Sequence, residues 1–200
     1  MRTIDPEKFA RKQGEILDAA GRCFARDGFH GASISSICAE AEISPGHLYH
    51  YFASKEAIVG AIIESSLANA VARFDRVVQS DDLVEAIIAE IEDVRGERCD
   101  PEPKVRLVQE MMAEGGRNPA IAGLLAKHHS TIRDLLSELL RRAQARGQVE
   151  RALDPDAAAA VLLGVLESAG TLAMYNPTLD PARNNEHLKM LIKRFLTPWA

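Results

Sequence analysis

The sequence predicts an all-α protein, and three observations support this prediction. Apolar residues recur every three or four positions along most of the 200 residues, which is the periodicity of a helix. No stretch keeps the apolar–polar alternation with β-branched residues that is typical of a strand. Proline, glycine and good helix-capping residues divide the chain into segments of ordinary helical length.

Three helices are expected at the N-terminal end. The first carries an apolar stripe that ends near Gly28, where a left-handed C-cap is favoured. Ser33 is a suitable N-cap for a short second helix. Ser44 and Pro45 predict a short third helix, because serine is favoured at the N-cap and proline at the first helical position. This order of helices is a helix-turn-helix, and a longer fourth helix is expected from Ser54.

Further helices are expected near residues 82–95, 103–115, 119–146, 155–175 and 184–196. The run 157–175 contains one charged residue, Glu167, and approaches the ~20 residues of a membrane span. Asp154 and Pro155 nevertheless open it like a helix of a water-soluble protein, and Ala, Gly and Leu dominate its composition. We therefore expect no membrane segment but a helix that is buried on most of its sides.

Charge and cysteine content restrict the class of protein. The net charge is −5, and residues 1–55 contain seven basic and seven acidic residues, so a polyanion would have to bind a local surface. Three widely spaced cysteines argue against a disulfide framework, and the N-terminus lacks the apolar core of a signal peptide. These features favour a cytoplasmic protein. We expect no enzyme, cofactor or metal site, because no such motif is present and His47 and His50 lack a third ligand.

The third helix has an inner and an outer side when its residues are spaced at 100°. Leu48 and Phe52 lie one turn apart and are expected to face the core. The outer side carries Gly46, Tyr49 and His50, with Pro45 and His47 in the first turn. This side offers a hydroxyl, imidazoles and open backbone without an acidic group. Together with the partial positive charge of a helix N-terminus, it suits phosphate.

The segment ASISSICAEAEISPGHLYHYFASKEAIV, residues 32–59, resembles the DNA-binding signature of the TetR family of transcriptional regulators. The shared features are the serine that opens the second helix, the Ile-x-x-x-Ala core spacing, the S-x-G-x-L-Y-x-Y-F pattern and the S-K-E at the fourth helix. The preceding segment, with its glycine turn, is similar to the first helix of the family. The resemblance covers roughly residues 12–62 and continues afterwards only as an all-helical pattern.

The resemblance assigns roles to the residues that match the signature. Ser33 and Tyr49 would contact phosphate or sugar, and Lys55 would reach a phosphate. Gly46 would let the backbone approach DNA closely. The other residues expected at the DNA surface are Ser44, Pro45, His47, His50 and Tyr51, among which Pro45 and His47 occupy positions where the family varies and contacts bases.

Two residues depart from the family pattern. Pro45 stands where relatives often have lysine, and Glu42 stands where a glycine is common in the turn. Both departures favour the alternative that the chain is a helical ligand-binding or protein-interaction module that does not bind DNA.

The resemblance also implies a division of labour along the chain. Residues 1–53 would form the helix-turn-helix DNA-binding domain, and residues 54–200 would bind an effector and dimerise. We expect a bacterial homodimeric repressor that leaves a palindromic double-stranded DNA operator when a small molecule binds. The helices near 119–146 and 155–175 would pair with their symmetry mates in a four-helix bundle.

Candidate effector contacts come from the second part of the chain. They are Phe74, Met111, Met112, His128, Met174 and Tyr175, which could line a cavity or equally belong to the core. Glu167 is a lone carboxylate in an apolar helix, so it is expected to meet a cationic ligand, a base across a dimer, or solvent. Glu110 and Glu114 raise the same question, and solvation is favoured for them.

Overall fold

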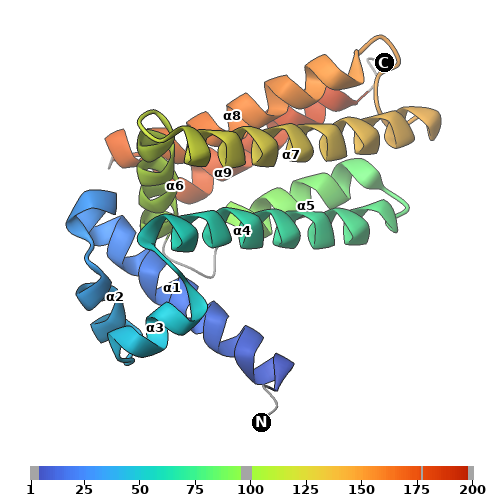
Figure 1. Cartoon of the computed structure of the whole chain (residues 1–200). Helices are drawn as coiled ribbons and strands as arrows, with labels where there is room; N and C mark the ends of the chain where they lie inside the picture. Colours follow the sequence, from blue (N-terminus) through green and yellow to red (C-terminus); the bar gives the residue numbers. More distant parts are fainter. Residues whose placement is uncertain (1–4, 96–100, 177, 198–200) are drawn as a thin grey trace. The chain divides into compact units, whose positions relative to one another are not determined.

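The computed structural model describes residues 5–95, 101–176 and 178–197. Within these ranges the chain is helical and contains no strand, so the all-α prediction is confirmed (Figure 1). The described helices are α1 (Pro6–Gly31), α2 (Ile34–Glu40), α3 (Pro45–Tyr51), α4 (Lys55–Val78), α5 (Leu83–Arg95), α6 (Pro101–Gly115), α7 (Pro119–Ala145), α8 (Pro155–Tyr175) and α9 (Pro181–Leu196).

The helix starts follow from capping chemistry. The Ser44 side chain accepts a hydrogen bond from the His47 backbone N–H, and Pro45 occupies the first helical position of α3. Asp154 and Asp180 cap α8 and α9 in the same way, each followed by proline. The last helix therefore begins three residues before the predicted position, because its Asp-Pro start was not recognised in the sequence.

Gly28 ends the regular part of α1 at the predicted position, but its backbone is not in the left-handed helical conformation that was expected of a C-cap. Its φ is 73° and its ψ is 167°, a backbone conformation that is open to glycine and strained for other residues. The chain kinks there, and one further turn continues to Gly31. This kink sets the path of the backbone into α2.

The contacts group the chain into two compact units, which are described separately. The first comprises Met1–Ser66 and Glu102–His128, and the second comprises Leu67–Pro101 and His129–Ala200. The core of the first is built from α1, α2, α3, α4 and α7, with Ile16, Phe24, Ile37, Leu48 and Ile58 almost fully buried. Residues 102–128 thus join the helix-turn-helix in one unit, whereas the predicted division fell after residue 53.

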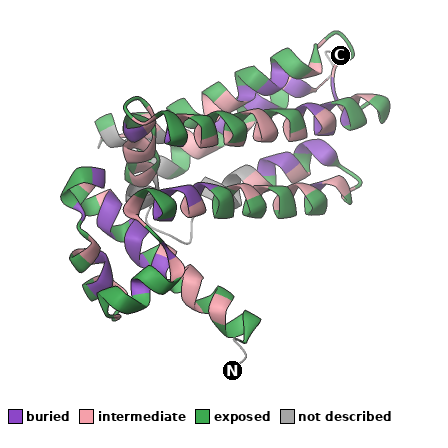
Figure 2. Ribbon diagram, in the orientation of Figure 1, coloured by how far each residue is buried: buried purple, intermediate pink, exposed green. Residues whose placement is uncertain are grey.

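The second unit has its own apolar core, which the end of α4 shares with α5, α7, α8 and α9. In this core Leu83, Leu140, Leu162 and Ile192 are buried. Figure 2 shows the buried stretches of the helices in purple. By length and composition alone, α4 is the one helix among the described residues that could cross a membrane, and a single helix of this kind is weak evidence.

The expectation that α8 is buried on most of its sides is wrong for a single chain. One side of α8 packs on the core through Ala158, Ala159 and Leu162. The other side exposes large apolar side chains, because Val161 is 53% and Tyr175 79% accessible to solvent. The helix is therefore apolar on two sides. One side packs on the core of the unit, and the other is exposed to solvent.

Candidate nucleic-acid interface

The outer side of α3 is open to solvent. Leu48 and Phe52 are buried at 0% and 4% accessibility, which confirms the predicted inner side. The residues Pro45, Gly46, His47, Tyr49 and His50 are exposed, and Tyr49 is 55% accessible. The structure therefore brings the residues that were predicted from the outer side together on one surface of a seven-residue helix. Their contacts with DNA remain predictions.

Gly46 has free space around it. A Cβ added at this position would meet no atom within 4 Å. Folding therefore does not require a glycine here, although glycine lowers helix stability by about 1 kcal/mol relative to alanine in a helix interior. The absence of a side chain agrees with the expected approach of the backbone to an external partner.

Tyr51 is held in a cluster of rings. Its ring centroid lies 4.6 Å from that of Phe9, 5.4 Å from that of His47 and 5.4 Å from that of His50. The His50 ring also meets Phe9 edge-on at 5.9 Å. Tyr51 is half-buried. Tyr51 is expected at the DNA surface, and these contacts give it a packing role as well.

The turn between α2 and α3 contains a strained residue. Glu42 has a φ of 54° and is the non-glycine residue with positive φ in the described chain. The Ile43 backbone N–H donates to the Cys38 carbonyl at 3.0 Å and closes the turn. The family glycine at this position is therefore replaced by a residue that keeps the left-handed backbone at an energetic cost.

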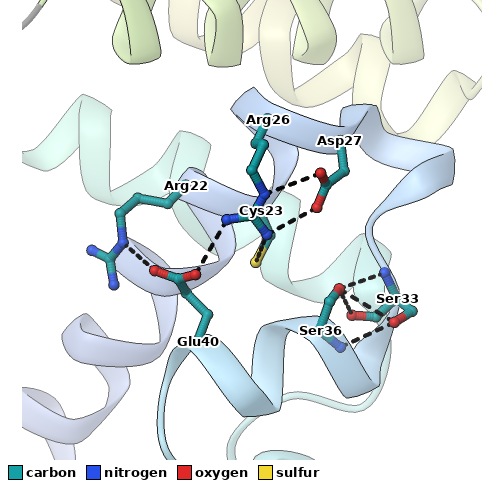
Figure 3. Close-up of polar contacts among 7 residues, drawn as sticks. All are labelled: Arg22, Cys23, Arg26, Asp27, Ser33, Ser36 and Glu40. Carbon is teal, nitrogen blue, oxygen red and sulfur yellow. Dashed lines mark hydrogen bonds and ion pairs between the residues drawn. The ribbon is translucent and has the colours of Figure 1, made fainter.

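Ser33 caps α2 and forms a capping box with Ser36 (Figure 3). The Ser33 Oγ accepts from the Ser36 N–H at 3.0 Å, and the Ser36 Oγ accepts from the Ser33 N–H at 2.9 Å. Ser33 is exposed, so its hydroxyl remains accessible to a phosphate. Capping of α2 is enough to explain a serine at this position, so the residue type alone does not require a contact with DNA.

A charged network joins α1 to α2 (Figure 3). The Glu40 carboxylate accepts from the Arg22 Nε at 2.7 Å and from the Arg26 Nη1 at 3.3 Å. Arg26 also holds both oxygens of Asp27 at 3.0 Å. The hydrogen bond from Arg22, followed by that from Arg26, lowers the pKa of Glu40. No local sequence pattern predicts this network, since its members are up to 18 residues apart.

Cys23 and Cys38 are buried in the same unit, as expected of structural thiols. Burial raises the pKa of both thiols, and the nearby Arg26 guanidinium opposes this effect at Cys23. Raised pKa values favour the unreactive thiol over the thiolate. Cys99 lies outside the described residues.

Lys55 contacts the end of α1. Its Nζ donates to the Phe29 carbonyl at 2.6 Å and to the Ala32 carbonyl at 3.1 Å. The same nitrogen lies 4.3 Å from the centroid of the Phe29 ring, a cation–π geometry. Two of the three ammonium N–H groups are thus occupied within the protein. The predicted phosphate contact stays a prediction, and the structure adds a structural role to it.

Two carboxylates of α6 approach the same segment. The Phe29 N–H donates to the Glu110 Oε2 at 3.1 Å. Glu114 is 5% accessible, and its Oε2 lies 3.3 Å from the His30 Nε2 and 3.7 Å from an Arg117 nitrogen. Neither contact of Glu114 has the geometry of a hydrogen bond. The expectation of solvation is therefore wrong for Glu114, and Glu110 has a definite backbone partner.

These contacts define what we call the Phe29 junction, residues 28–32 together with Lys55 and Glu110. The backbone of Phe29 is hydrogen-bonded to two different helices. Its N–H donates to Glu110 of α6, and its carbonyl accepts from Lys55 of α4. A cavity of about 10 Å³ lies beside it, lined by Phe24, Phe29, Val59, Glu110, Met111 and Glu114. Such a volume holds at most one water molecule.

The predicted effector contacts do not form one site within either unit. Met111, Met112 and His128 belong to the first unit, and Phe74, Glu167, Met174 and Tyr175 belong to the second. Met111 and Phe74 pack against the two cores, whereas Met112 and Tyr175 are exposed. The His128 Nε2 lies 3.3 Å from the Ser66 Oγ. The side chain of Met174 lies outside the described residues.

Glu167 is exposed and has a partner on the same chain. Its Oε1 lies 2.5 Å from the His129 Nε2, and both side chains are about half accessible. Its exposure agrees with the expected contact with solvent, and its pairing with His129 of the same chain was not among the predicted alternatives. A hollow of about 200 Å³ in the same unit is lined by Leu179, Asp180, Arg183, Asn184 and His187, none of which was a predicted effector contact.

Comparison with known proteins agrees with the geometry of the first three helices. Residues 16–62 match the family described as bacterial regulatory proteins, tetR family, and residues 80–197 match the C-terminal domain of BetI-type transcriptional repressors. The chain belongs to the TetR family of transcriptional regulators. The resemblance found in the sequence is confirmed, and with it the function of a DNA-binding transcriptional regulator.

Individual relatives cover most of the chain. The HTH-type transcriptional regulator UidR of Escherichia coli K12 is 41% identical over 138 residues, which are 67% of each chain. Among solved structures, Salmonella enterica GusR has a TM-score of 0.75 and 32% identity, and the match covers 93% of this chain and 95% of that one. A regulator from Rhodococcus sp. has a TM-score of 0.80 at 20% identity, which shows a common fold.

Proposed function

We propose that the protein is a homodimeric repressor that binds a palindromic operator through the outer side of α3 and is released by a small-molecule effector. The observation that supports operator binding is the open outer side of α3, where hydroxyl, imidazole and bare backbone are exposed without an acidic side chain. Each copy would insert α3 into one major groove, and Ser33 and Tyr49 would fix its register on the phosphates. A bacterial operator as partner implies action in the cytoplasm.

The proposed dimer surface is the uncovered apolar side of the second unit. Val161, Leu172 and Tyr175 of α8 are exposed, as are Met190 and Leu191 of α9. No large apolar side chain of α7 is exposed in the described chain, and its solvent side carries charges such as Arg133 and Arg142. These exposures favour a bundle of α8 and α9 from two copies over the expected pairing of α7 with α8.

A gel shift with the DNA upstream of the protein's own gene tests the function. We expect a discrete complex that competitor DNA of unrelated sequence does not remove. Light scattering at micromolar concentration is expected to show a dimer, and Val161→Arg is expected to shift it to a monomer with weaker operator binding. A wild-type chain that binds all DNA equally, or that is monomeric, would contradict the proposal.

The effector remains to be identified by experiment. Binding of an effector must favour a state that fits the operator less well, because a ligand shifts a conformational equilibrium only by its differential affinity. A thermal-shift screen of small molecules would detect such a ligand by stabilisation. A compound that raises the melting temperature should also weaken the gel-shift complex. Stabilising compounds that leave the complex unchanged would not be effectors.

A further inference from the structure

The first turns of α1 lie against α3, the helix that is proposed to enter the major groove. Phe9 is half-buried, and its ring meets Tyr51 at 4.6 Å and His50 at 5.9 Å. Both partners belong to α3, and His50 is exposed on its outer side. Asp5 caps this end of α1 by accepting from the N–H groups of Glu7 and Lys8, so the helix is ordered up to Pro6. The start of α1 is therefore an extension of the α3 surface.

Basic residues gather on one side of these turns. Lys8, Arg11 and Lys12 stand at positions i, i+3 and i+4, which places them on one flank of the helix next to Phe9. Lys12 is engaged by Glu15 at 2.9 Å. Lys8 and Arg11 are exposed, and neither has an ion pair within the described part of the chain. The hydrogen bond and charge of Lys12, followed by the charge of Arg11, lower the pKa of Glu15, so Arg11 also lies near this carboxylate. Two cations thus remain available beside α3.

The neighbouring acids keep their charge but form no ion pair with these two cations among the described contacts. The Asp5 carboxylate is occupied by the backbone of the first turn. Glu7 is exposed and lies one turn before Arg11, without an ion pair between them among the described contacts. Residues 5–15 contain three acidic and three basic residues, so this segment is neutral in a chain whose net charge is −5. Lys8 and Arg11 present two exposed cations on one flank of it, next to the α3 surface.

We propose that Lys8 and Arg11 bind phosphates of the operator backbone on the flank of the groove that α3 enters. The inference rests on the proposed function and extends the DNA contacts to the first turns of α1. Phe9 is the positioning residue, because its ring contacts with His50 and Tyr51 hold the basic flank beside α3. DNA is the occupant because the flank continues the α3 surface and phosphate complements its charge.

Fluorescence anisotropy with the upstream DNA and the full-length protein tests the proposal. Lys8→Gln and Arg11→Gln are each expected to weaken binding about tenfold at physiological salt and to reduce the slope of log K against log salt by about 2 per dimer, one phosphate for each head. Arg151→Gln is the matched control, since Arg151 is exposed in the second unit. It is expected to change neither quantity, and none of these variants should alter the melting temperature.

A double-mutant cycle with Phe9→Ala tests the positioning role. In the Phe9→Ala background, Lys8→Gln is expected to cost less than half of its effect on log K in the wild type, because the flank is no longer held against α3. A purely structural role of Phe9 would lower stability and leave the cost of Lys8→Gln unchanged.

The outcomes separate this inference from the proposed function. If the wild-type protein binds the upstream DNA and Lys8→Gln and Arg11→Gln keep the wild-type affinity and salt slope, the inference is wrong and operator recognition stands. If the wild type shows no preference for this DNA, the proposed function fails first. Equal loss on operator and unrelated DNA supports phosphate contacts, whereas a loss confined to the operator sequence would assign Lys8 and Arg11 to bases and overturn the proposal.

Discussion

The polar groups on the outer side of α3 are exposed to solvent, whereas those of the Phe29 junction have hydrogen-bond partners within the protein. On α3 the imidazoles, the Tyr49 ring and the backbone at Gly46 are exposed to solvent. At the junction the Phe29 N–H and carbonyl and the Lys55 ammonium all have partners within the protein. Polar residues of one sequence signature can therefore serve either an external partner or the fold, and only the contacts tell the two apart.

Lys55 offers the sharpest test of this difference. Lys55→Met keeps the aliphatic stem but leaves the Phe29 and Ala32 carbonyls without their donor. We expect the free energy of unfolding to fall by about 2 kcal/mol, since losing a partner of buried backbone groups costs more than a hydrogen bond is worth net. Urea denaturation followed by circular dichroism measures the loss.

Tyr49→Phe provides the opposite case for the same comparison. It removes one exposed hydroxyl, so stability should be unchanged while operator affinity falls.

The Lys55 prediction would be contradicted by a Lys55→Met protein that keeps wild-type stability and whose salt slope for DNA binding is smaller by about 2. Lys55 would then act on DNA with α3 and not at the junction.

Gly46→Ala tests whether DNA backbone lies close to the outer side of α3. An added methyl group meets no protein atom, so we expect stability to rise by up to about 1 kcal/mol. Operator affinity should fall about tenfold if DNA backbone lies close to this position. Gly14→Ala is the matched control, because its Cβ also meets nothing within 4 Å. It should stabilise α1 and leave DNA affinity unchanged. An unchanged affinity of Gly46→Ala would show that the partner stays at a distance.

The sequence predicted the α3 surface better than the junction, for a physical reason. Helix starts and inner and outer sides depend on local spacing, so Ser44 as a cap and Leu48 as a core residue were correctly predicted. The contacts of Lys55 and Glu110 join residues 23 to 81 positions apart, which no local pattern encodes. The burial of Glu114 and the pairing of Glu167 with His129 depend on the same long-range packing.

Glu42→Gly tests the turn that sets the angle of α3. Relief of the left-handed strain is worth roughly 1–2 kcal/mol, and the greater freedom of glycine in the unfolded chain offsets part of it. We expect a net stabilisation of about 0.5 kcal/mol in urea denaturation. Glu42→Gln separates strain from charge, because it keeps the strained backbone. It should leave stability unchanged and strengthen DNA binding slightly at low salt. Equal stabilisation by both variants would indicate that charge, and not backbone strain, is the cost at this turn.

Glu40→Gln measures how much a charged contact at the surface contributes to stability, for comparison with the buried hydrogen bonds of the Phe29 junction. The hydrogen bonds from Arg22 and Arg26 lower the pKa of Glu40 in the folded protein. A carboxyl whose folded pKa is lowered stabilises the fold above its unfolded pKa, and this stabilisation is lost as the pH falls through the folded pKa. The wild type should therefore be more stable than Glu40→Gln at pH 7, and the difference should disappear as the solution is acidified below about pH 4. Glu64→Gln, an exposed control on α4 without an ion pair in the described chain, should have the stability of the wild type at pH 7. A difference that persists at low pH would mean that Glu40 acts through packing, because only its charge is lost on protonation.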